Sequence, residues 1–568
     1  MTQTANGVRQ SGTRTLVRRQ LAMGAAGLLL LTACAQRTTG VMPRPASAAS
    51  VEQGTRGSGP APVLVESFDG LGSGFSGPQG RAALRNPSDN TLAVGRDHIV
   101  QIVNSRMAIF SRSGSRFDST GRAVYGPVPT NTLFRGAGGA CEARNSGDAV
   151  ARYDQLAERW LIVMPVFQRS AWHADDPPAP RPGAPAVLSR PLRAGQPGVA
   201  VALHVPSPVF DSTAVRAPAT RDSGAYAMCY AVSTSPDPTG SWYRYEFIRP
   251  LFPDYPRPAV WPDGWYVPSS TGDDVIEKHA CVADRARMLR GEAATEQCVV
   301  IADVNFLNNA DLDGAALPPA GAPNVMLAAG GTQLRDRLRD SVLLAWTFHV
   351  DWADVRNTRL KGPVTIPVAP YEYMCGGQLT KCVPQPGTDV RLDAQGDKLM
   401  ARVVYRRIGN RESIVASHSV NTTFGGGGVR WYELQVARDR SLRVAQQGTF
   451  APDSNARWMA SPAMDRFGNI GIGYSVASAT IYPGQRFTGR AASDPPGTLG
   501  LGETVLVHGA AAQTTTLRWQ DYTQTAVDPR DDCTIWYVGD YFKAGATAYS
   551  SRIGAFRLPR CIGTPVSR

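Results

Sequence analysis

The sequence predicts an all-β chain, and three observations support this class. From about Asn86 onward, short apolar or aromatic runs with period-two alternation recur, each bounded by Gly, Pro, Asn or Asp. Helical periodicity is nearly absent from the same stretch. Turns that contain aspartate repeat ahead of the β-rich runs. We therefore expect strands joined by turns, with few helices, from Asn86 to the C-terminus.

The N-terminus has the pattern of a bacterial lipoprotein export signal. An arginine-rich start precedes an apolar stretch from Leu21 to Leu31, and Cys34 follows Ala33 directly. The apolar core is too short to span a bilayer. We predict a signal peptide over residues 1–33 and lipid on Cys34, which would anchor the mature protein in a membrane outside the cytoplasm. An ordinary signal peptide cut near Ala33 and an apolar N-terminal anchor are the alternatives.

The route and destination of export are less specific. The pair Arg18-Arg19 resembles a twin-arginine signal, but its flanking residues match the full motif poorly, so both export routes stay open. The residue after the lipid candidate, Ala35, is not acidic. This predicts sorting to the outer membrane, on its periplasmic side or at the cell surface.

The mature chain divides into a tether and one large domain. Residues 34–85 are rich in small residues, Gly and Pro, which predicts a flexible tether. Residues 86–568 form the predicted domain. Within it, residues 168–222 are rich in Pro, Ala and Arg and lack sustained alternation, so we expect a mostly exposed insertion between strands.

Eight cysteines remain after the lipid candidate, and an even number in an exported chain predicts four disulfides. Their order along the chain favours the pairs Cys141–Cys229, Cys281–Cys298, Cys375–Cys382 and Cys533–Cys561. Free buried thiols are the alternative. No cysteine or histidine cluster has zinc-site spacing.

The charge excludes one class of partner. The formal net charge of the chain is +12, and residues 1–33 hold four arginines and no acid, which leaves +8 for the mature protein. The arginines are scattered without a basic run, so we do not expect nucleic-acid binding. We expect a monomer without a cofactor.

Repeated turns decide the predicted architecture. An aspartate precedes or opens a turn before a β-rich run at Asp154, Asp263, Asp393, Asp465 and Asp528. Their spacing fits four-stranded units enlarged by loops, which predicts a single β-propeller of six to eight blades, with seven preferred. Stacked β-sandwiches are the alternative.

Several short motifs strengthen this interpretation. They are the segments Val94–Gln101, Tyr153–Trp160, Ser235–Trp242, Asp254–Pro256, Val260–Asp263, Arg457–Met459 and Asp531–Thr534. With these motifs the chain resembles a family of large exported bacterial proteins that is mostly uncharacterised and is thought to consist of β-propellers. The resemblance implies the same fold but brings no established activity and no catalytic residues.

The standard catalytic signatures are missing from the sequence. It has no nucleophile elbow, zinc-protease helix, phosphate-binding loop or dinucleotide fingerprint. The run Gly473–Ala477 comes nearest to an elbow but has the pattern of a strand. The segment Asp311–Gly314 offers two carboxylates, which is a weak start for a calcium site, and a capped loop is the preferred interpretation. We therefore predict no metal site.

Arginines beside aromatic residues in the C-terminal half are the candidate ligand-binding residues, because an aromatic ring stacks on sugars while a guanidinium binds carboxylates or hydroxyls. The candidates are Arg430, Arg457, Arg490, Arg518, Trp519 and His418. Weak catalytic candidates are Glu412, Asp521 and Tyr522. Packing between blades is the competing interpretation for each of these residues.

Three classes of function remain open. We favour a non-enzymatic surface module that binds a glycan or an envelope protein through the propeller face. A propeller-type glycoside hydrolase would require two carboxylates that converge, such as Glu412 and Asp521. A structural envelope role is the third class, and the fold alone does not choose among them.

Overall fold

The computed structural model describes residues 51–82, 84–167, 201–204, 226–249, 252–270, 278–301, 304, 306–329, 341–377 and 380–562. Residue contacts divide the chain into the units Met1–Arg44 and Pro45–Arg568, and all described residues belong to the second unit. The predicted signal peptide, Cys34 and the start of the tether lie outside the described residues.

Strands dominate the described residues, which confirms the all-β class. The α-helices among them are α1 (Gly139–Ala143) and α2 (Arg285–Leu289), each five residues long. The 3-10 helices are η2 (Thr130–Phe134), η4 (Val355–Asn357), η5 (Met374–Gly376) and η6 (Pro559–Cys561). Over the part of the chain that the structure describes, no helix is long and apolar enough to cross a membrane.

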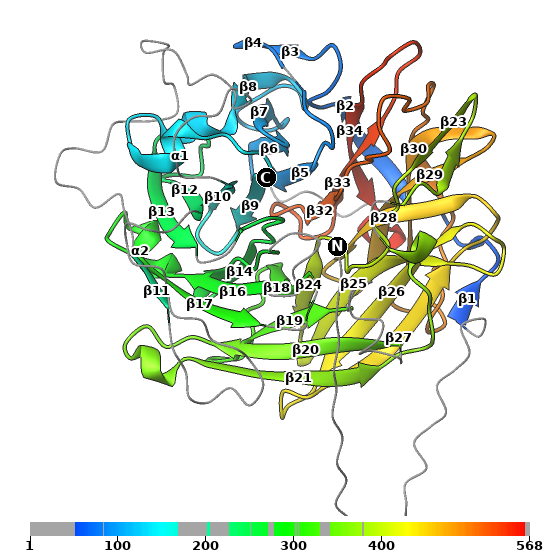
Figure 1. Cartoon of the computed structure of the whole chain (residues 1–568). Coiled ribbons are helices and arrows are strands. Elements are labelled where there is room, and N and C mark those ends of the chain that lie inside the picture. The colour runs from blue at the N-terminus through cyan, green and yellow to red at the C-terminus, as the bar shows by residue number, and fades with distance from the viewer. Residues whose placement is uncertain are drawn as a thin grey trace, which may run out of the picture. The chain divides into compact units, whose positions relative to one another are not determined.

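The described strands form seven antiparallel groups of four, and the first three groups follow each other along the chain (Figure 1). Group one is β5 (Thr91–Val94), β6 (His98–Val103), β7 (Arg106–Ser111) and β8 (Ala123–Pro129). Group two is β9 (Val150–Asp154), β10 (Arg159–Val166), β12 (Tyr226–Ser233) and β13 (Trp242–Arg249). Group three is β14 (Ala259–Trp261), β15 (Gly264–Tyr266), β16 (Lys278–Ala283) and β17 (Thr295–Ile301).

Groups four and five join into one sheet, because their first strands pair in parallel. Group four is β18 (Asn308–Asp313), β19 (Asn324–Ala328), β20 (Val342–His349) and β21 (Arg359–Pro367). Group five is β24 (Val403–Ile408), β25 (Arg411–Asn421), β26 (Gly427–Val436) and β27 (Leu442–Phe450). Group six is β28 (Ala456–Met464), β29 (Ile470–Ser478), β30 (Ile481–Arg490) and β31 (Thr504–Val507).

The seventh group combines both ends of the described chain. Three of its strands are β32 (Gln524–Val527), β33 (Ile535–Tyr541) and β34 (Ser550–Arg557), and the fourth is β2 (Val63–Asp69), which pairs antiparallel with β34. The predicted tether boundary at residue 85 is therefore wrong. The sequence could not show this, because the pairing partner of β2 lies at the far end of the chain.

Further short strands attach to the edges of the groups. Strand β1 (Glu52–Gln53) runs parallel to β27. Strand β11 (Val201–His204) runs parallel to β17 and is the one part of the predicted insertion 168–222 within the described residues. Residues 168–222 fall between β10 and β12, which pair with each other. Two small hairpins are β3 (Ser76–Gly77) with β4 (Gly80–Arg81), and β22 (Val383–Gln385) with β23 (Thr388–Leu392).

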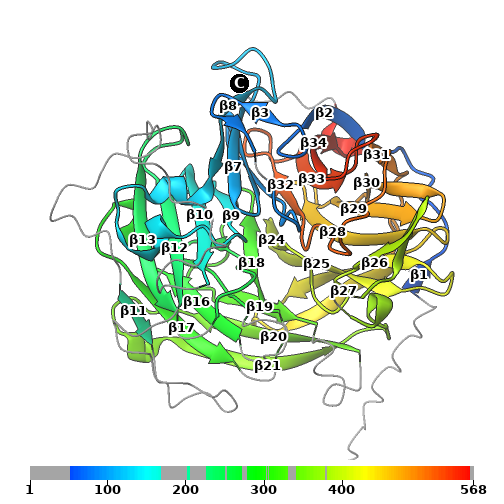
Figure 2. The same ribbon diagram turned by 45° about the horizontal axis from the view of Figure 1, so that its top comes forward.

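The first strands of the groups contact one another in chain order. Strand β5 contacts β9, β9 contacts β14, and the series continues through β18, β24 and β28 to β32. Strand β32 in turn contacts β5. Figure 2 shows β9, β18, β24, β28 and β32 around the middle of the view, with β13, β21 and β27 farther out.

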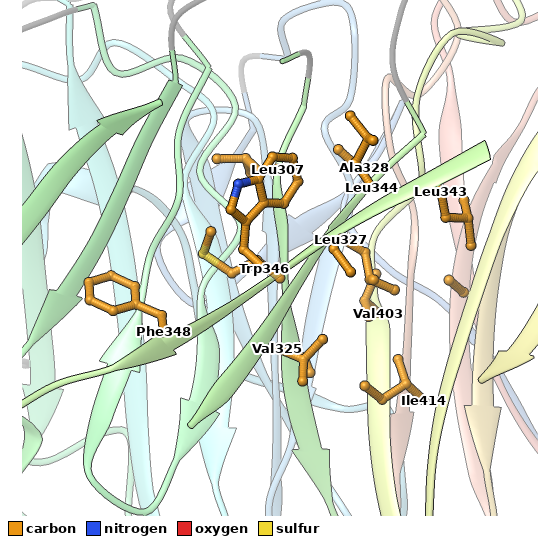
Figure 3. Packing of buried hydrophobic residues seen from close by; sticks show 14 of the residues in the cluster. Leu307, Val325, Leu327, Ala328, Leu343, Leu344, Trp346, Phe348, Val403 and Ile414 are labelled. Atoms are coloured by element: carbon orange, nitrogen blue, oxygen red, sulfur yellow. The ribbon is translucent and has the colours of Figure 1, made fainter. Parts of the chain in front are cut away.

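The core lies between successive groups. Aliphatic and aromatic side chains of groups three to five form the largest cluster, and Figure 3 shows Trp346 and Phe348 of β20 in it with Ile414 of β25. Between groups six and seven, Phe487 stacks on Phe556 with ring centroids 4.2 Å apart. Inner strands such as β28 are buried along their whole length because both faces are covered, whereas the outer strand β21 is largely exposed.

A polar seam closes group seven against group one. The side-chain amide of Gln101 donates to Asn90 Oδ1 (2.9 Å) and to Ser551 Oγ (2.8 Å). Asn90 Nδ2 donates to Asp540 Oδ1 over 2.8 Å, and Gln101 Oε1 accepts from the backbone N–H of Leu71 over 2.7 Å. These buried hydrogen bonds join group one, near the start of the described chain, to strands β33 and β34 of group seven, near its end.

Four of the five predicted aspartate turns join the first and second strands of a group. Asp154, Asp263, Asp465 and Asp528 lie in or beside these hairpins, and the carboxylate of Asp465 accepts the N–H of Phe467 over 2.8 Å. The prediction is wrong for the Asp393 turn. This residue lies in an irregular segment between β23 and β24, where its carboxylate accepts the backbone N–H of Gln395 in the same segment and that of Thr380, which precedes β22.

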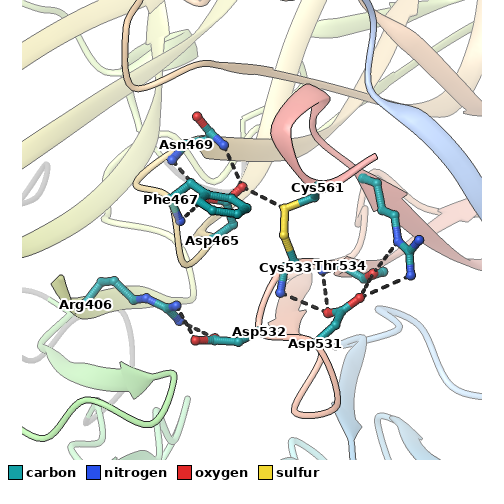
Figure 4. The surroundings of a disulfide bond; sticks show 10 residues. Arg406, Asp465, Phe467, Asn469, Asp531, Asp532, Cys533, Thr534 and Cys561 are labelled. Atoms are coloured by element: carbon teal, nitrogen blue, oxygen red, sulfur yellow. Dashed lines mark hydrogen bonds and ion pairs between the residues drawn. A yellow bond between two sulfur atoms is a disulfide. The ribbon is translucent and has the colours of Figure 1, made fainter. Parts of the chain in front are cut away.

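The structure contains the four disulfides that the order of the cysteines favours. Cys281 and Cys298 are direct partners in the β16–β17 ladder. Cys533 and Cys561 flank β33 and β34, so their bond joins the two ends of the last hairpin (Figure 4). Next to it, Asp531 accepts the backbone N–H groups of Cys533 and Thr534 at 2.9 and 2.8 Å. The disulfide therefore secures the closing segment.

We predict that a chain starting at residue 70 will unfold at a much lower temperature than one starting at residue 51, because the first lacks β1 and β2 and leaves the β34 edge unpaired. The loss should reach about 5 kcal/mol, comparable to the whole stability of many domains. Thermal unfolding followed by circular dichroism measures it. The chain from residue 51 is the control and should match the full chain; equal midpoints for both truncations would contradict the role of β2.

Candidate functional site

The segments that lead into the first strands share an unusual backbone conformation. Each group has at least one non-glycine residue with φ between 46° and 63°, shortly before its first strand or within it. Such residues are uncommon and concentrate at functional sites. They are Asp89, Asp148, Tyr255, Phe306, Gln395, Met459, Gln520 and Asp521. Because the first strands contact one another, these residues meet at one end of the strands.

Aromatic contacts demonstrate this convergence. Tyr255 packs edge-on against Phe306 and Tyr522, with ring centroids 5.2 and 4.9 Å away. The Lys398 ammonium lies 3.7 Å from the centroid of Phe306 and 4.7 Å from that of Tyr255. Segments from groups three, four, five and seven thus meet in one place.

Four aspartates, here called the carboxylate cluster, lie at this end: Asp89, Asp148, Asp254 and Asp521. Side-chain hydrogen bonds join Asp148 to both Asp89 and Asp254. Asp89 is 2% exposed and also accepts from the Asn104 amide, whereas Asp148 and Asp254 are only half-buried. The cluster therefore has a closed inner part and a partly open outer part.

Burial strongly perturbs the carboxyl groups of Asp89 and Asp148. It raises the pKa of Asp89 well above its usual range, and the negative charge of Asp521 adds to this rise. Burial also raises the pKa of Asp148 well above its usual range, with a further contribution from the charge of Asp89. Two carboxyl groups in hydrogen-bond contact retain a proton between them, because both cannot ionise cheaply in a buried place.

Cations partly balance the cluster. Arg518 forms an ion pair with Asp521, and its Nε donates to Asp521 Oδ1 over 3.2 Å. Gln395 Nε2 donates to Asp393 Oδ2 over 2.9 Å, and Lys398 donates to Gln395. Burial raises the pKa of Asp393 to about 6, and the charge of Asp521 contributes to this shift.

Arg257 is the exception among these cations. Its side chain lies 3.8 Å from the ring centroid of Tyr255 and 5.1 Å from that of Tyr522, and the residue is 5% exposed. None of its three guanidinium nitrogens has a hydrogen-bond partner, and the hydroxyl of Tyr522 also lacks one. Burial lowers the pKa of Arg257, whereas the nearby Asp521 and Asp148 oppose this shift.

Three of the residues predicted from the sequence belong to this site: Asp521, Tyr522 and Arg518. Trp519 is adjacent in the chain but turns away, because its Nε1 donates to Ser475 Oγ over 3.0 Å and its ring stacks near Phe542. The predicted pair of Glu412 and Asp521 does not converge. Glu412 accepts from Tyr405 Oη and Arg440 Nη1, both over 2.7 Å, at the start of β25.

The remaining predicted ligand-binding residues serve packing instead. His418 Nε2 lies 2.9 Å from the Tyr432 hydroxyl, and burial together with the charge of Arg430 lowers its pKa to about 3. Arg430 is buried and donates to the Ala369 carbonyl over 2.7 Å. Both side chains are buried, and these contacts are made within the fold.

Two more arginines are occupied in the same way. Arg457 forms ion pairs with Asp453 (2.7 Å) and Glu503 (3.0 Å). Arg490 donates to the Asp494 carbonyl over 2.6 Å. Arg457, which precedes Trp458, is thus bonded within the fold, whereas Arg518, which precedes Trp519, belongs to the candidate site.

At the opposite end of the first strands lies a cavity of about 260 Å³. Strands β5, β9, β18 and β32 line it, together with residues of the turns that follow them. On its wall, Arg402 Nε binds Asp311 Oδ2 over 2.7 Å, Arg402 also pairs with Asp313, and Arg152 Nε lies 3.2 Å from Asp311 Oδ2. The carboxylates considered for calcium are thus held by arginines.

Sequence reasoning missed Asp89, Asp148, Asp254 and Arg257. The motif Asp254–Pro256 did stand out, but only as part of a resemblance. No sequence pattern marks a left-handed aspartate, because the conformation is imposed by tertiary packing. The partners also come from groups one, two, three and seven.

Comparisons with known proteins do not reveal a family: no family model and no curated protein matches the sequence. A leech intramolecular trans-sialidase is 9% identical to this chain with a TM-score of 0.34. The match covers 69% of this chain and 65% of the trans-sialidase, so this chain spans about 65% of the length of that protein. An endo-1,5-α-L-arabinanase from Thermotoga petrophila is 10% identical with a TM-score of 0.24, over 84% of this chain and 99% of that chain. A protein of unknown function from Dyadobacter fermentans is 11% identical with a TM-score of 0.24, over 54% of this chain and 95% of that chain.

We predict that Asp148→Asn will weaken the pH dependence of stability. The folded state raises the pKa of Asp148, so protonated Asp148 adds to the free energy of unfolding. This stabilisation is complete below about pH 3.8 and is lost as the pH rises through the raised pKa. Asparagine does not titrate, so the variant should lose less stability between pH 5 and 8, by about 1.4 kcal/mol for each unit of pKa shift.

Urea unfolding at several pH values measures this difference. Asp439→Asn is the matched control, since Asp439 is exposed and its hydrogen bond from Ser441 lowers its pKa, which leaves it ionised over the whole range. The same slope for wild type and Asp148→Asn would contradict the buried carboxyl pair.

Proposed function

We propose that this chain is an exported, lipid-anchored, seven-bladed β-propeller that binds a glycan at the carboxylate cluster. Seven groups of four strands and the contacts from β5 around to β32 and back support the propeller. The addition of β2 to the last group would close the ring. Four disulfides support an oxidising compartment, and the segment before Cys34 supports the anchor.

The observation that carries the binding function is the half-buried pair Asp148 and Asp254 at the open side of the cluster. Carboxyl oxygens accept hydrogen bonds from sugar hydroxyls, and the place where the first strands meet positions these groups rigidly. The buried Asp89 behind Asp148 fixes its orientation through their hydrogen bond.

Binding is favoured over hydrolysis by the spacing of the carboxyls. Glycosidases place two carboxyl groups about 5 to 10 Å apart on either side of the bond that they cleave. Asp89 and Asp148 are in hydrogen-bond contact, so no sugar fits between them. A hydrolase is the second candidate, because the raised pKa of the half-buried Asp148 suits a general acid.

The test applies the purified full-length protein to a panel of neutral and acidic oligosaccharides and records both retention and released sugar. We expect retention without release, and Asp148→Ala combined with Asp254→Ala should weaken retention by about tenfold or more, because hydrogen bonds to charged groups contribute about 1.5–3 kcal/mol.

Glu412→Gln is the control for this test, since Glu412 is a candidate from the sequence that lies outside the cluster. It should retain the same glycans as wild type. Release of sugar would favour the hydrolase, and retention that survives the double substitution would place the site elsewhere.

A further inference from the structure

The guanidinium of Arg257 is a buried cation without an acceptor. Arginine carries five N–H donors, and a buried arginine normally binds carboxylates or backbone carbonyls. Arg249, for comparison, is fully buried and binds Glu296 over 2.6 Å. The nitrogens of Arg257 have no such partner. Leaving a buried charge unpaired is costly, so its retention in a fold calls for an explanation.

The nearby carboxylates do not supply the missing acceptor. Asp521 is bound by Arg518 and Gln395, and Asp89 by Asn104 and Asp148. Asp521 and Asp148 attract Arg257 through space without a hydrogen bond to it. The local charges thus hold a cation in place and leave its donors unused.

The donors around this point define the chemistry of the missing partner. A guanidinium presents two parallel N–H groups that match the two oxygens of a carboxylate. The unpartnered Tyr522 hydroxyl, whose ring lies beside Arg257, offers a further donor. Asp148 and Asp254 provide acceptors for hydroxyl groups on the same ligand.

We propose that Arg257 binds the carboxylate of an acidic sugar, as in a uronic acid, while Asp148 and Asp254 bind its hydroxyls. This inference rests on the proposed glycan-binding function and specifies its ligand. A doubly charged phosphate group fits less well, because the charges of Asp521 and Asp148 lie nearby. A carboxylate, a singly charged group that accepts two parallel hydrogen bonds, suits a site in which Asp89 and Asp148 share a proton.

The test measures binding of an oligogalacturonate and of the same oligosaccharide with its carboxyls reduced to hydroxymethyl groups, by calorimetry on the full-length protein. We expect wild type to bind the acidic form about 30-fold or more tightly, the loss typical of an unpaired buried charge. Arg257→Met should abolish this preference. Arg257→Lys should retain part of it, and Tyr522→Phe should reduce it severalfold.

The outcomes separate this inference from the function on which it rests. Equal binding of the acidic and reduced forms by wild type would overturn the acidic-sugar assignment and leave glycan binding intact. Binding of neither form, with acetate bound in an Arg257-dependent way, would overturn both and assign the site to free carboxylates.

Stability gives a readout that does not depend on the ligand. Because the Arg257 guanidinium makes no hydrogen bond in the free protein, Arg257→Met should keep or raise the Tm without ligand, whereas Arg430→Met should lower it, since the buried Arg430 donates hydrogen bonds through both of its terminal nitrogens. A loss of Tm in Arg257→Met as large as that in Arg430→Met would identify Arg257 as a structural residue and overturn the proposal.

Discussion

The structure depends on one constraint: each four-stranded group has two apolar faces, and each face must be covered by the next group. The chain meets this constraint by packing the groups in sequence, with clusters such as Phe487 against Phe556 between neighbours. A series of sheets packed in this way has two ends, and both would expose apolar faces to water. Closure of the last group onto the first removes them.

Closure explains two features that otherwise seem unrelated. The first is β2, whose residues come from a stretch that reads as a linker but complete the last sheet beside β34. The second is the polar seam around Gln101 and Asn90, where buried amides rather than methyl groups join the two ends. Hydrogen-bonded amides demand one geometry, so the seam specifies which groups meet, while apolar packing supplies most of the attraction. The disulfide Cys533–Cys561 then holds the closing hairpin.

The sequence predicted the features that arise from local physics. Apolar runs identify strands because each strand packs on both sides, and an aspartate turn such as Asp465 is visible because its carboxylate binds its own backbone. The disulfides followed from chain order. Features that depend on distant pairing were missed: β2 has its partner about 490 residues later, and Asp89 and Asp148 belong to different groups.

The arginines show why the candidate site was only partly predictable. Arg457 beside Trp458 has the sequence appearance of a sugar-binding pair, yet it is satisfied by Asp453 and Glu503. Arg257 lies in a Pro-flanked segment without any such appearance, yet its guanidinium lacks a hydrogen-bond partner. Whether an arginine is available to a ligand depends on which acceptors the fold brings to it. That is a property of the assembled structure and not of its neighbours in sequence.

The same constraint that closes the fold also creates the candidate site. Where the first strands of the described groups meet, the segments that enter them crowd together, and several of their residues take left-handed conformations. Polar side chains from distant segments are then held where water is scarce, which raises carboxyl pKa values and leaves a cation such as Arg257 without solvent. A site of this kind costs stability in the free protein and regains it on binding, so the fold's apolar layers provide the stability that the polar centre gives up.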